Sequence, residues 1–289
     1  NLTQNRMSGW LCGMVRAETK AGLNIDINGR ASFGSPWFRY LNDQLIANNK
    51  NFLHYTDVFY YGADLPYRGH SIDLVESASG VAEAEELSKG WRDFVCVQPL
   101  TSDSKKNYGL ESFAIAVESF KLSNPKVDVV LLGAPFEYEA IEDCRRYCEQ
   151  RGVEVHVALV SLPTAFSLLV RAKALLTGDT AIKHLACATD CKILEIAIGS
   201  SDYRKTGVYK PGSFILQSVE GCHPCDHRGA CHRTQHFCSQ GIDPKIVGTV
   251  FSNVVDGNTR QLKLLAREYS DQFHLYQTFF IHSGFWYAR

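Results

Sequence analysis

The fold is decided by the stretch that begins DFVCVQPL (93–100), LESFAIAVESFKL (110–122) and KVDVVLLGAP (126–135). The first and third pieces are short apolar runs that stop at proline or glycine, as buried strands do, and the piece between them has apolar residues at helical spacing. The pattern continues with a polar-faced helix, a strand, a helix, a strand end, a helix and a strand at 137–152, 153–160, 163–174, 175–180, 181–190 and 192–199. Strands that alternate with helices form a parallel sheet through right-handed crossovers. We therefore predict a doubly wound α/β domain with helices on both faces over residues 93–220.

The first ninety residues have a different pattern. SPWFRYLNDQLIANN (35–49) and FLHYTDVFYYGADLPY (52–67) have the period of amphipathic helices and are rich in aromatics, which is typical of a domain face that covers a cleft. VAEAEELSKGW (81–91) is predicted to be an exposed helix closed by Gly90. We place a domain boundary after it, which gives domains 1–92 and 93–289.

Composition excludes several classes of protein. The 289 residues include 30 Lys and Arg against 31 Asp and Glu, a net charge of −1, whereas nucleic-acid-binding proteins usually carry a clear basic excess. Every apolar stretch is shorter than the roughly 18–20 residues of a membrane helix, so we expect a soluble protein with at most peripheral membrane contact. Six cysteines are scattered through apolar or helical stretches, where a free cysteine behaves as a small hydrophobe, so we expect a cytoplasmic setting. The chain begins at Asn1 and not at a methionine, and we expect it to be a piece of a longer protein.

The α/β pattern also predicts where a ligand binds. In doubly wound sheets, ligands lie beyond the carboxyl ends of the strands. The loops that follow three of the predicted strands, at 98–106, 133–137 and 178–184, should therefore converge on one crevice.

Two of these loops have the chemistry of a phosphate site. QPLTSDSKKNYGLESF (98–113) offers the hydroxyls of Thr101 and Ser102, free N–H groups at a helix start, and the ammonium groups of Lys105 and Lys106. The alternative interpretation is a solvated loop with an ordinary Ser or Asp cap.

GDTAIKHLACA (178–188) repeats this arrangement. Gly178 frees the backbone, Asp179 or Thr180 caps the next helix, and the amides of the first turn point at the crevice. Four residues at helical spacing share one face of that helix: Ala181, His184, Leu185 and Ala188. His184 is either a site residue or a satisfied core histidine.

Three motifs, in this order, resemble the nucleotide-sugar-binding half of glycosyltransferase family 9, the bacterial lipopolysaccharide heptosyltransferase family with the GT-B fold. Lys106, Tyr108, Glu111 and Phe113 occupy the Lys, Trp, Glu and Phe places of the family's Lys-Arg-Trp-Pro-x-Glu-x-Phe loop. LLGAPFE (131–137) matches its Leu-Gly-x-x-x-Glu strand end, with Glu137 at the acidic place. Asp179, Thr180 and His184 match its Asp-Thr-Gly-x-x-His turn.

The chain departs from the family pattern at three places. Asn107 replaces Arg, Gly109 replaces Pro, and Ala181 replaces the Gly of the turn, where it adds a Cβ on the path of the sugar diphosphate. The first ninety residues resemble only the latter part of the acceptor-binding half, with Asn1 to Thr3 at the place of a strand end. The family's catalytic Asp precedes that strand, so we assign no general base.

The resemblance implies a GT-B-like glycosyltransferase with a partial N-terminal α/β acceptor domain. It implies an inverting, metal-independent transfer of a sugar, a heptose in this family, from a nucleotide diphosphate to a lipopolysaccharide or lipid-linked acceptor at the inner face of the inner membrane. Lys106 and the amides around 180–182 would meet the charge of the diphosphate, Glu137 would bind the nucleoside, and Asp179 with His184 would orient the sugar or phosphate.

Four cysteines cluster in GCHPCDHRGACHRTQHFC (221–238), with His223, His227, His232 and His236 interleaved. Cys222, Cys225, Cys231 and Cys238 have the C-x2-C knuckle and the ligand type of a structural Zn²⁺ site. Iron–sulfur ligation and a metal-free loop are the alternatives. Two other functions stay open at this point, a non-catalytic nucleotide-sugar-binding module and a metal-stabilised interaction module.

The segment after the cysteine cluster has Asp243 as a helix cap and Pro244 at the first helical position, which predicts a helix start there.

Overall fold

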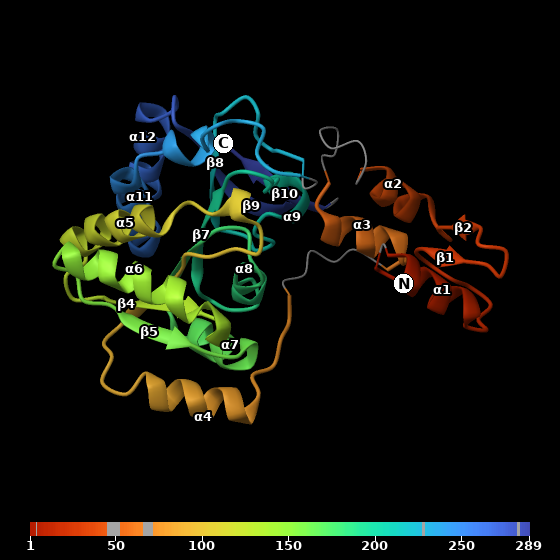
Figure 1. Ribbon diagram of the computed structural model, residues 1–289, viewed down its shortest axis with the longest axis horizontal. Coiled ribbons are helices and arrows are strands. Elements are labelled where there is room, and N and C mark those ends of the chain that lie inside the picture. The colour runs from red at the N-terminus through yellow and green to blue at the C-terminus, as the bar shows by residue number, and fades with distance from the viewer. Residues whose placement is uncertain (4, 45–52, 66–71, 227–228, 282–283) are drawn as a thin grey trace. The chain divides into compact units, whose positions relative to one another are not determined.

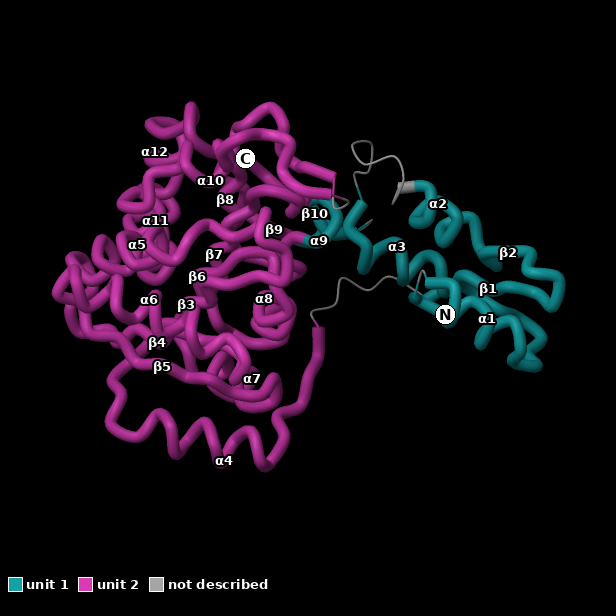
Figure 2. The backbone as a smooth tube through the Cα atoms, viewed as in Figure 1, with its two compact units in different colours: residues 1–70, 204–206, 280–286 teal, residues 71–203, 207–279, 287–289 magenta. Residues whose placement is uncertain are grey.

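The computed structural model describes residues 1–3, 5–44, 53–65, 72–226, 229–281 and 284–289. The chain divides into two compact units (Figure 2). The small unit is Asn1–His70 with Arg204–Thr206 and Phe280–Trp286, and the large unit is Ser71–Tyr203, Gly207–Phe279 and Tyr287–Arg289.

The large unit is built on an eight-stranded sheet of order β10-β9-β8-β7-β6-β3-β4-β5 (Figure 1). The strands of the sheet are β3 (Phe94–Gln98), β4 (Asp128–Gly133), β5 (His156–Leu159), β6 (Ala174–Thr177), β7 (Lys192–Ala197), β8 (Phe214–Ser218), β9 (Phe273–Ile281) and β10 (Gly284–Ala288). The end of β9 and the start of β10, within Phe280–Trp286, are counted with the small unit. Neighbours from β5 to β8 are parallel, and β9 is antiparallel to β8. Because β3 lies between β4 and β6, the sheet grows first toward one edge and then toward the other. This confirms the predicted doubly wound sheet.

Helices form two layers over this sheet (Figure 1). In one layer α11 (Pro244–Asp256) packs on α5 (Leu110–Ser123), which packs on α6 (Tyr138–Gln150). In the other, α4 (Ala78–Leu87) packs on α7 (Leu162–Arg171), which packs on α8 (Ala181–Ala186). The helix α12 (Thr259–Glu268) follows α11. The Asp243 carboxylate accepts the Lys245 N–H at 2.9 Å, and Pro244 opens α11, as predicted.

The core of the large unit lies between the first layer and the sheet. Phe113 and Phe120 on α5 pack with Val95 and Leu131 of the central strands, and Phe251 of α11 lies 5.1 Å from Phe120, ring centre to ring centre. These strands are buried on both faces, which is why they appear in the sequence as continuous apolar runs.

The structure places the boundary between the units earlier than the sequence suggested. The segment from Ser71 to 92 belongs to the large unit and not to the first domain, because α4 is held on α7. The Thr164 hydroxyl donates to Glu83 at 2.5 Å, and Arg171 pairs with Glu76 at 2.8 Å. A Cβ at Gly80 would lie 2.7 Å from the Pro163 carbonyl oxygen, so the two helices touch through backbone.

The small unit contains α1 (Arg6–Met14), a short hairpin of β1 (Asn24–Ile25) and β2 (Ala31–Ser32), α2 (Pro36–Gln44) and α3 (Tyr55–Gly62). Phe38 and Leu41 of α2 pack against Val58 of α3. The two aromatic helices were predicted, and the parts of those predictions at 45–49, 52 and 66–67 lie outside the described residues. The strand end expected at residues 1–3 is not formed, and α1 follows instead, capped by Asn5.

Beyond these elements, the large unit has two short helices, α9 (Tyr203–Thr206, partly in the small unit) and α10 (Phe237–Gln240), and two 3₁₀ turns, Ser104–Lys106 and Pro135–Glu137. Among the helices that the structure describes, none combines the length and apolarity needed to span a membrane.

Candidate functional site

A cavity of about 620 Å³ opens at the carboxyl ends of β3, β4, β5 and β6. Its lining residues are 98, 100–102, 132–137, 160–162, 165 and 180–182. The predicted convergence of three loops is therefore confirmed, and a fourth loop, between β5 and α7, joins them. Lys106, Asp179 and His184 lie beside this wall and do not line it.

The cavity wall has an apolar part and a polar part. Leu132, Val160, Leu162 and Ala165 form an apolar surface, and Phe136 lies at the opening with 88% of its surface exposed. The hydroxyls belong to residues 101, 102, 161 and 180. Such a wall suits a ligand with one flat apolar end and one polar end.

The loop after β3 is held together by its own polar groups. The Thr101 N–H and hydroxyl lie 2.8 and 2.9 Å from Asn107 Oδ1, and the hydroxyl also lies 2.7 Å from the Asp103 carbonyl oxygen. Asp103 caps the following 3₁₀ turn by accepting the Lys105 N–H at 3.0 Å. Thr101 therefore shapes the loop, while Ser102 is exposed on the cavity wall. Asn107, where the chain departs from the family motif, is a structural residue of this loop.

The two adjacent lysines of this loop have different environments. Lys105 is buried, and its Nζ donates to the carbonyl oxygens of Asp226 at 2.6 Å and Gly229 at 2.7 Å. Lys106 Nζ lies 3.2 Å from Asp179 Oδ2 and 3.4 Å from the Asp179 carbonyl oxygen. Lys105 thus holds the Cys-rich loop, and Lys106 reaches the turn that precedes α8.

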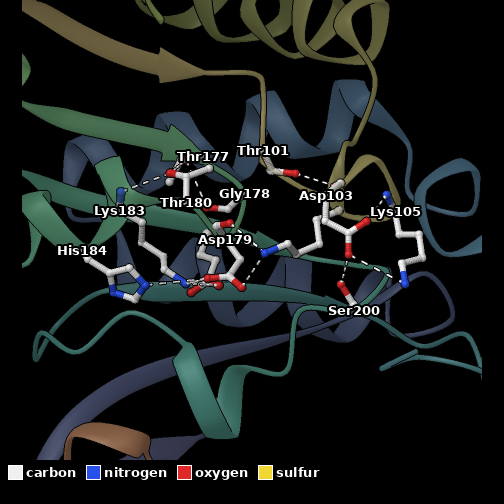
Figure 3. Close-up of polar contacts among 12 residues, drawn as sticks. Thr101, Asp103, Lys105, Thr177, Gly178, Asp179, Thr180, Lys183, His184 and Ser200 are labelled. Carbon is white, nitrogen blue, oxygen red and sulfur yellow. Dashed lines mark hydrogen bonds and ion pairs between the residues drawn. The ribbon is translucent and has the colours of Figure 1, made fainter. Parts of the chain in front are cut away.

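A buried ion-pair cluster stands behind that turn (Figure 3). Lys183 Nζ donates to Asp179 Oδ1 at 2.6 Å and to Glu195 Oε1 at 2.8 Å. The other Glu195 oxygen accepts the Val208 N–H at 2.9 Å. Neither Lys183 nor Glu195 exposes any surface, so four charged groups form one chain from Lys106 to Glu195. The sequence analysis missed Lys183 and Glu195; the one signal was a glutamate in the middle of the apolar strand KILEIA.

Burial and charge act against each other in this cluster. Burial opposes ionisation of Asp179, but the ammonium groups of Lys183 and Lys106 outweigh it and hold the pKa of Asp179 below its ordinary value. Burial also disfavours the charged form of Lys183, yet its two carboxylate partners raise its pKa. For Glu195 burial prevails over the attraction of Lys183, so its pKa is raised.

His184 is kept neutral at physiological pH. Burial, followed by the charge of Lys183, lowers the pKa of His184 to about 4. Its Nε2 lies 3.9 Å from Asp179 Oδ1 (Figure 3). A neutral imidazole can exchange hydrogen bonds with a ligand but adds no positive charge to the site.

The turn at 178–182 is tightly fitted. A Cβ at Gly178 would lie 3.0 Å from Thr101 Cγ2, so this glycine lets the two loops approach. Thr180 is the residue that caps α8, and its hydroxyl accepts the Lys183 N–H at 3.3 Å. The buried residues of α8 are Lys183 and Ala186, whereas Ala181 is exposed at the cavity wall, so the face with Ala181 and His184 is not the packed one.

The remaining motif residues support the fold. The Tyr108 hydroxyl donates to the Ile242 carbonyl oxygen at 2.7 Å, and its ring packs edge-on against Phe113. Glu111 is exposed and pairs with Arg151 at 3.2 Å. Glu137 lines the cavity, but its carboxylate accepts the Ala134 N–H at 2.7 Å and so closes the 3₁₀ turn.

The Cys-rich loop lies against the site. Cys225 N–H donates to the Gly199 carbonyl oxygen at 2.7 Å, and the His223 ring contacts the same oxygen at 3.0 Å. Burial and then the neighbouring thiols of Cys238, Cys222 and Cys231 raise the pKa of Cys225. All four are free thiols, and within the described ranges no three His, Cys, Asp or Glu side chains are arranged to hold a metal. His227 lies outside those ranges, and the metal site stays a prediction.

Comparison with known proteins identifies the family of this chain. The family model of glycosyltransferase family 9 (heptosyltransferase) matches residues 1–235. The structure of Escherichia coli ADP-heptose lipopolysaccharide heptosyltransferase II is similar with a TM-score of 0.53 and 18% identity, covering 68% of this chain and 57% of that one. A family 9 glycosyltransferase from Veillonella parvula is similar with a TM-score of 0.50 and 16% identity, covering 58% and 50%.

No curated protein matches the chain significantly. The chain covers only 50% and 57% of the two solved relatives, and their low identity shows a shared fold. The family model, by contrast, spans most of the sequence and includes all the cavity-lining residues. The chain belongs to glycosyltransferase family 9, the heptosyltransferase family.

Proposed function

We propose that the protein is an inverting glycosyltransferase that transfers a sugar, a heptose, from a nucleoside diphosphate to a lipopolysaccharide or other cell-envelope glycan. The observation that carries this proposal is the cavity at the point where the sheet reverses its order, with the Lys106 ammonium held beside it. The similar E. coli enzyme is an ADP-heptose lipopolysaccharide heptosyltransferase, which supports adenosine diphosphate as the leaving group.

The reaction would be a single displacement. The acceptor oxygen attacks the anomeric carbon and gives its proton to a base, while the bond from that carbon to the diphosphate oxygen breaks and the diphosphate leaves with the electron pair. The protein must stabilise the negative charge that develops on the leaving group. Lys106 supplies a cation for this, and the loops at 100–102 and 180–182 supply hydroxyl and backbone donors.

We propose that donor binding needs no divalent metal. The carboxylates of Asp103 and Asp179 lie near the polar wall, and both have partners within the protein. Asp103 accepts the Ser200 hydroxyl at 2.6 Å, and Asp179 is bound by two lysines. A Mg²⁺ ion that bridged a diphosphate would need such carboxylates as ligands.

Calorimetric titration with ADP, UDP and GDP, with and without EDTA, tests the binding proposal. Lys106→Ala should weaken the best diphosphate by about 1.5–3 kcal/mol, since this is the usual contribution of a charge-assisted contact. Lys173→Ala is the matched control, because Lys173 is an exposed lysine that pairs with Asp93 at the far, amino-terminal end of the strands. The proposal is wrong if no diphosphate binds, if both variants lose affinity equally, or if EDTA abolishes binding.

Catalysis is tested separately from binding. The full-length protein with the sugar form of the best nucleotide and a glycan acceptor should release the nucleoside diphosphate, and the product should have inverted anomeric configuration by NMR. A protein that binds the same donors with the same dependence on Lys106 but releases no diphosphate would be a nucleotide-sugar-binding module.

We also propose that Cys222, Cys225, Cys231 and Cys238 hold a structural Zn²⁺. Support comes from the C-x2-C spacing of Cys222 and Cys225 and from the position of all four cysteines as free thiols within one segment of the chain. Protein purified without oxygen should contain stoichiometric zinc, and Cys225→Ser should lose it while Cys12→Ser, a partly exposed thiol of the small unit, should keep it. Absence of zinc, or iron in its place, contradicts this proposal.

A further inference from the structure

Lys183 and Glu195 form a buried ion pair that does not touch the cavity. Lys183 is on the short helix α8 and Glu195 is in the middle of β7, and both side chains are completely buried. A buried ion pair contributes little net stability, and an apolar pair of similar volume is often at least as stable. Fold stability is therefore a weak explanation for this pair.

The pair is connected to the site through one carboxylate. Asp179 divides its two oxygens between two lysines, with Oδ1 on the buried Lys183 and Oδ2 on Lys106. The residue after Asp179 already belongs to the cavity wall. Lys106 is thus the end of the cluster on the cavity side, and the fully buried Lys183 lies further inside.

We propose that Lys183 and Glu195 are positioning residues, which set through Asp179 where Lys106 lies and how much of its charge is left for the diphosphate of the donor. This inference rests on the proposed donor site. Lys183 supplies Asp179 with a permanent counter-ion. Asp179 can then orient the Lys106 ammonium without neutralising it. Glu195 limits this effect because it competes with Asp179 for Lys183.

The two residues should therefore act with opposite sign. In Lys183→Met, the ammonium on Asp179 Oδ1 is removed and the carboxylate neutralises Lys106 more fully, so diphosphate affinity should fall about tenfold or more. In Glu195→Gln, Lys183 loses the competing carboxylate and is held more strongly by Asp179, and affinity should equal or exceed that of the wild type. A purely structural role would make both variants lose affinity together.

Titration of the full-length protein with the best diphosphate of the panel and with its parent nucleoside measures the effect. Lys183→Met should weaken the diphosphate and leave the nucleoside unchanged. The double variant Lys183→Met/Glu195→Gln should show the same loss of diphosphate affinity as Lys183→Met. It leaves no unpaired carboxylate at position 195. It can therefore replace Lys183→Met in this experiment if that single variant does not fold. Asp128→Asn is the control: Asp128 accepts the Arg92 N–H at 2.9 Å at the amino-terminal start of β4, away from the cavity.

A double-mutant cycle tests whether Lys183 acts through Lys106. Adding Lys183→Met to Lys106→Ala should cause no further loss of diphosphate affinity, because the group on which Lys183 acts is already absent. Additive losses overturn the inference, as does a folded Lys183 variant that binds the diphosphate as wild type does. In both cases the donor site itself stands if Lys106→Ala alone weakens the diphosphate. If Lys106→Ala has no effect, the proposed donor site fails and the inference fails with it.

Discussion

At the scale of single residues, His184 shows how a nearby ammonium group changes the chemistry of a site. The sequence suggested that this histidine would orient the sugar or phosphate. The structure puts it 3.9 Å from Asp179 but keeps it neutral, because burial and the charge of Lys183 both oppose its protonation. At neutral pH it can therefore act as a hydrogen-bonding group and not as a cation.

The lowered pKa predicts how stability depends on pH. The pKa of His184 is about 4 in the folded protein against an ordinary 6.5, so between these values the unfolded chain binds more protons. The stabilising contribution is complete above pH 6.5 and is lost as the pH falls toward 4. Urea unfolding at pH 7, 6, 5 and 4.5 should show a smaller decline for His184→Gln than for wild type.

The comparison between the two proteins cancels the other groups that titrate in this range. His274 also has a lowered pKa, from burial and the charge of Arg289, and Glu195 has a raised one with the opposite effect on stability. Both are present in wild type and variant. Parallel stability curves would mean that His184 titrates normally.

Sequence reasoning found one end of the charged cluster and missed the other. Lys106 and Asp179 were predicted as site residues, because each lies in a loop at the carboxyl end of a predicted strand. The sequence gives no sign that Lys183 belongs to the site, since a lysine on a short helix is usually solvated. Its burial depends on Glu195, which the fold brings to within 2.8 Å although it is 12 residues away in the chain.

At the scale of elements, the site depends on the close approach of two loops. Gly199 follows β7 with a φ of +61°, and a Cβ there would lie 1.9 Å from the Lys105 carbonyl oxygen. The Ser200 hydroxyl then donates to Asp103 at 2.6 Å. The loop after β7 thus packs directly against the loop that carries Lys106.

Gly199→Ala should disrupt this contact between the two loops. Overpacking a close contact costs about 1–3 kcal/mol, in addition to the backbone strain of a left-handed residue. Gly212→Ala is a matched control, because its φ of +75° gives the same strain while its Cβ would meet no atom within 4 Å. Urea denaturation should show a larger loss of unfolding free energy for Gly199→Ala, with weaker diphosphate binding. Equal losses in the two variants would show that backbone strain alone accounts for the effect.

The strands differ in how well their sequence patterns predicted them. Strands β3, β4, β6 and β7 were predicted because strands buried on both faces are continuously apolar. The strands β8, β9 and β10 were not predicted. In β9, FHLYQTFFI, buried and partly exposed positions alternate at first, and its partner β8 lies more than fifty residues earlier. Local periodicity does not identify such a partner.

At the scale of the whole molecule, the two units differ in their contribution to the cavity. Every residue that lines the cavity belongs to the large unit. The small unit closes on itself through Asp57 of α3, whose buried Oδ2 accepts the Phe285 N–H at 3.0 Å. This contact joins parts of the small unit that are 228 residues apart in sequence. Donor binding should therefore not depend on it.

Asp57→Ala tests this division. Removing the carboxylate leaves a buried N–H without this acceptor, which costs about 1–3 kcal/mol and should loosen the small unit. We expect the diphosphate affinity of Asp57→Ala in calorimetry to stay within about twofold of the wild type. A twofold change is about 0.4 kcal/mol, which is less than the loss of one ligand contact would cause. Sugar transfer to the acceptor should fall if the first ninety residues contribute to acceptor binding, as their resemblance to the latter part of the family's acceptor-binding half implies. A parallel loss of diphosphate affinity would show that the cavity depends on the small unit. The Lys106 ammonium would then owe its position to contacts beyond the cluster that ends at Glu195.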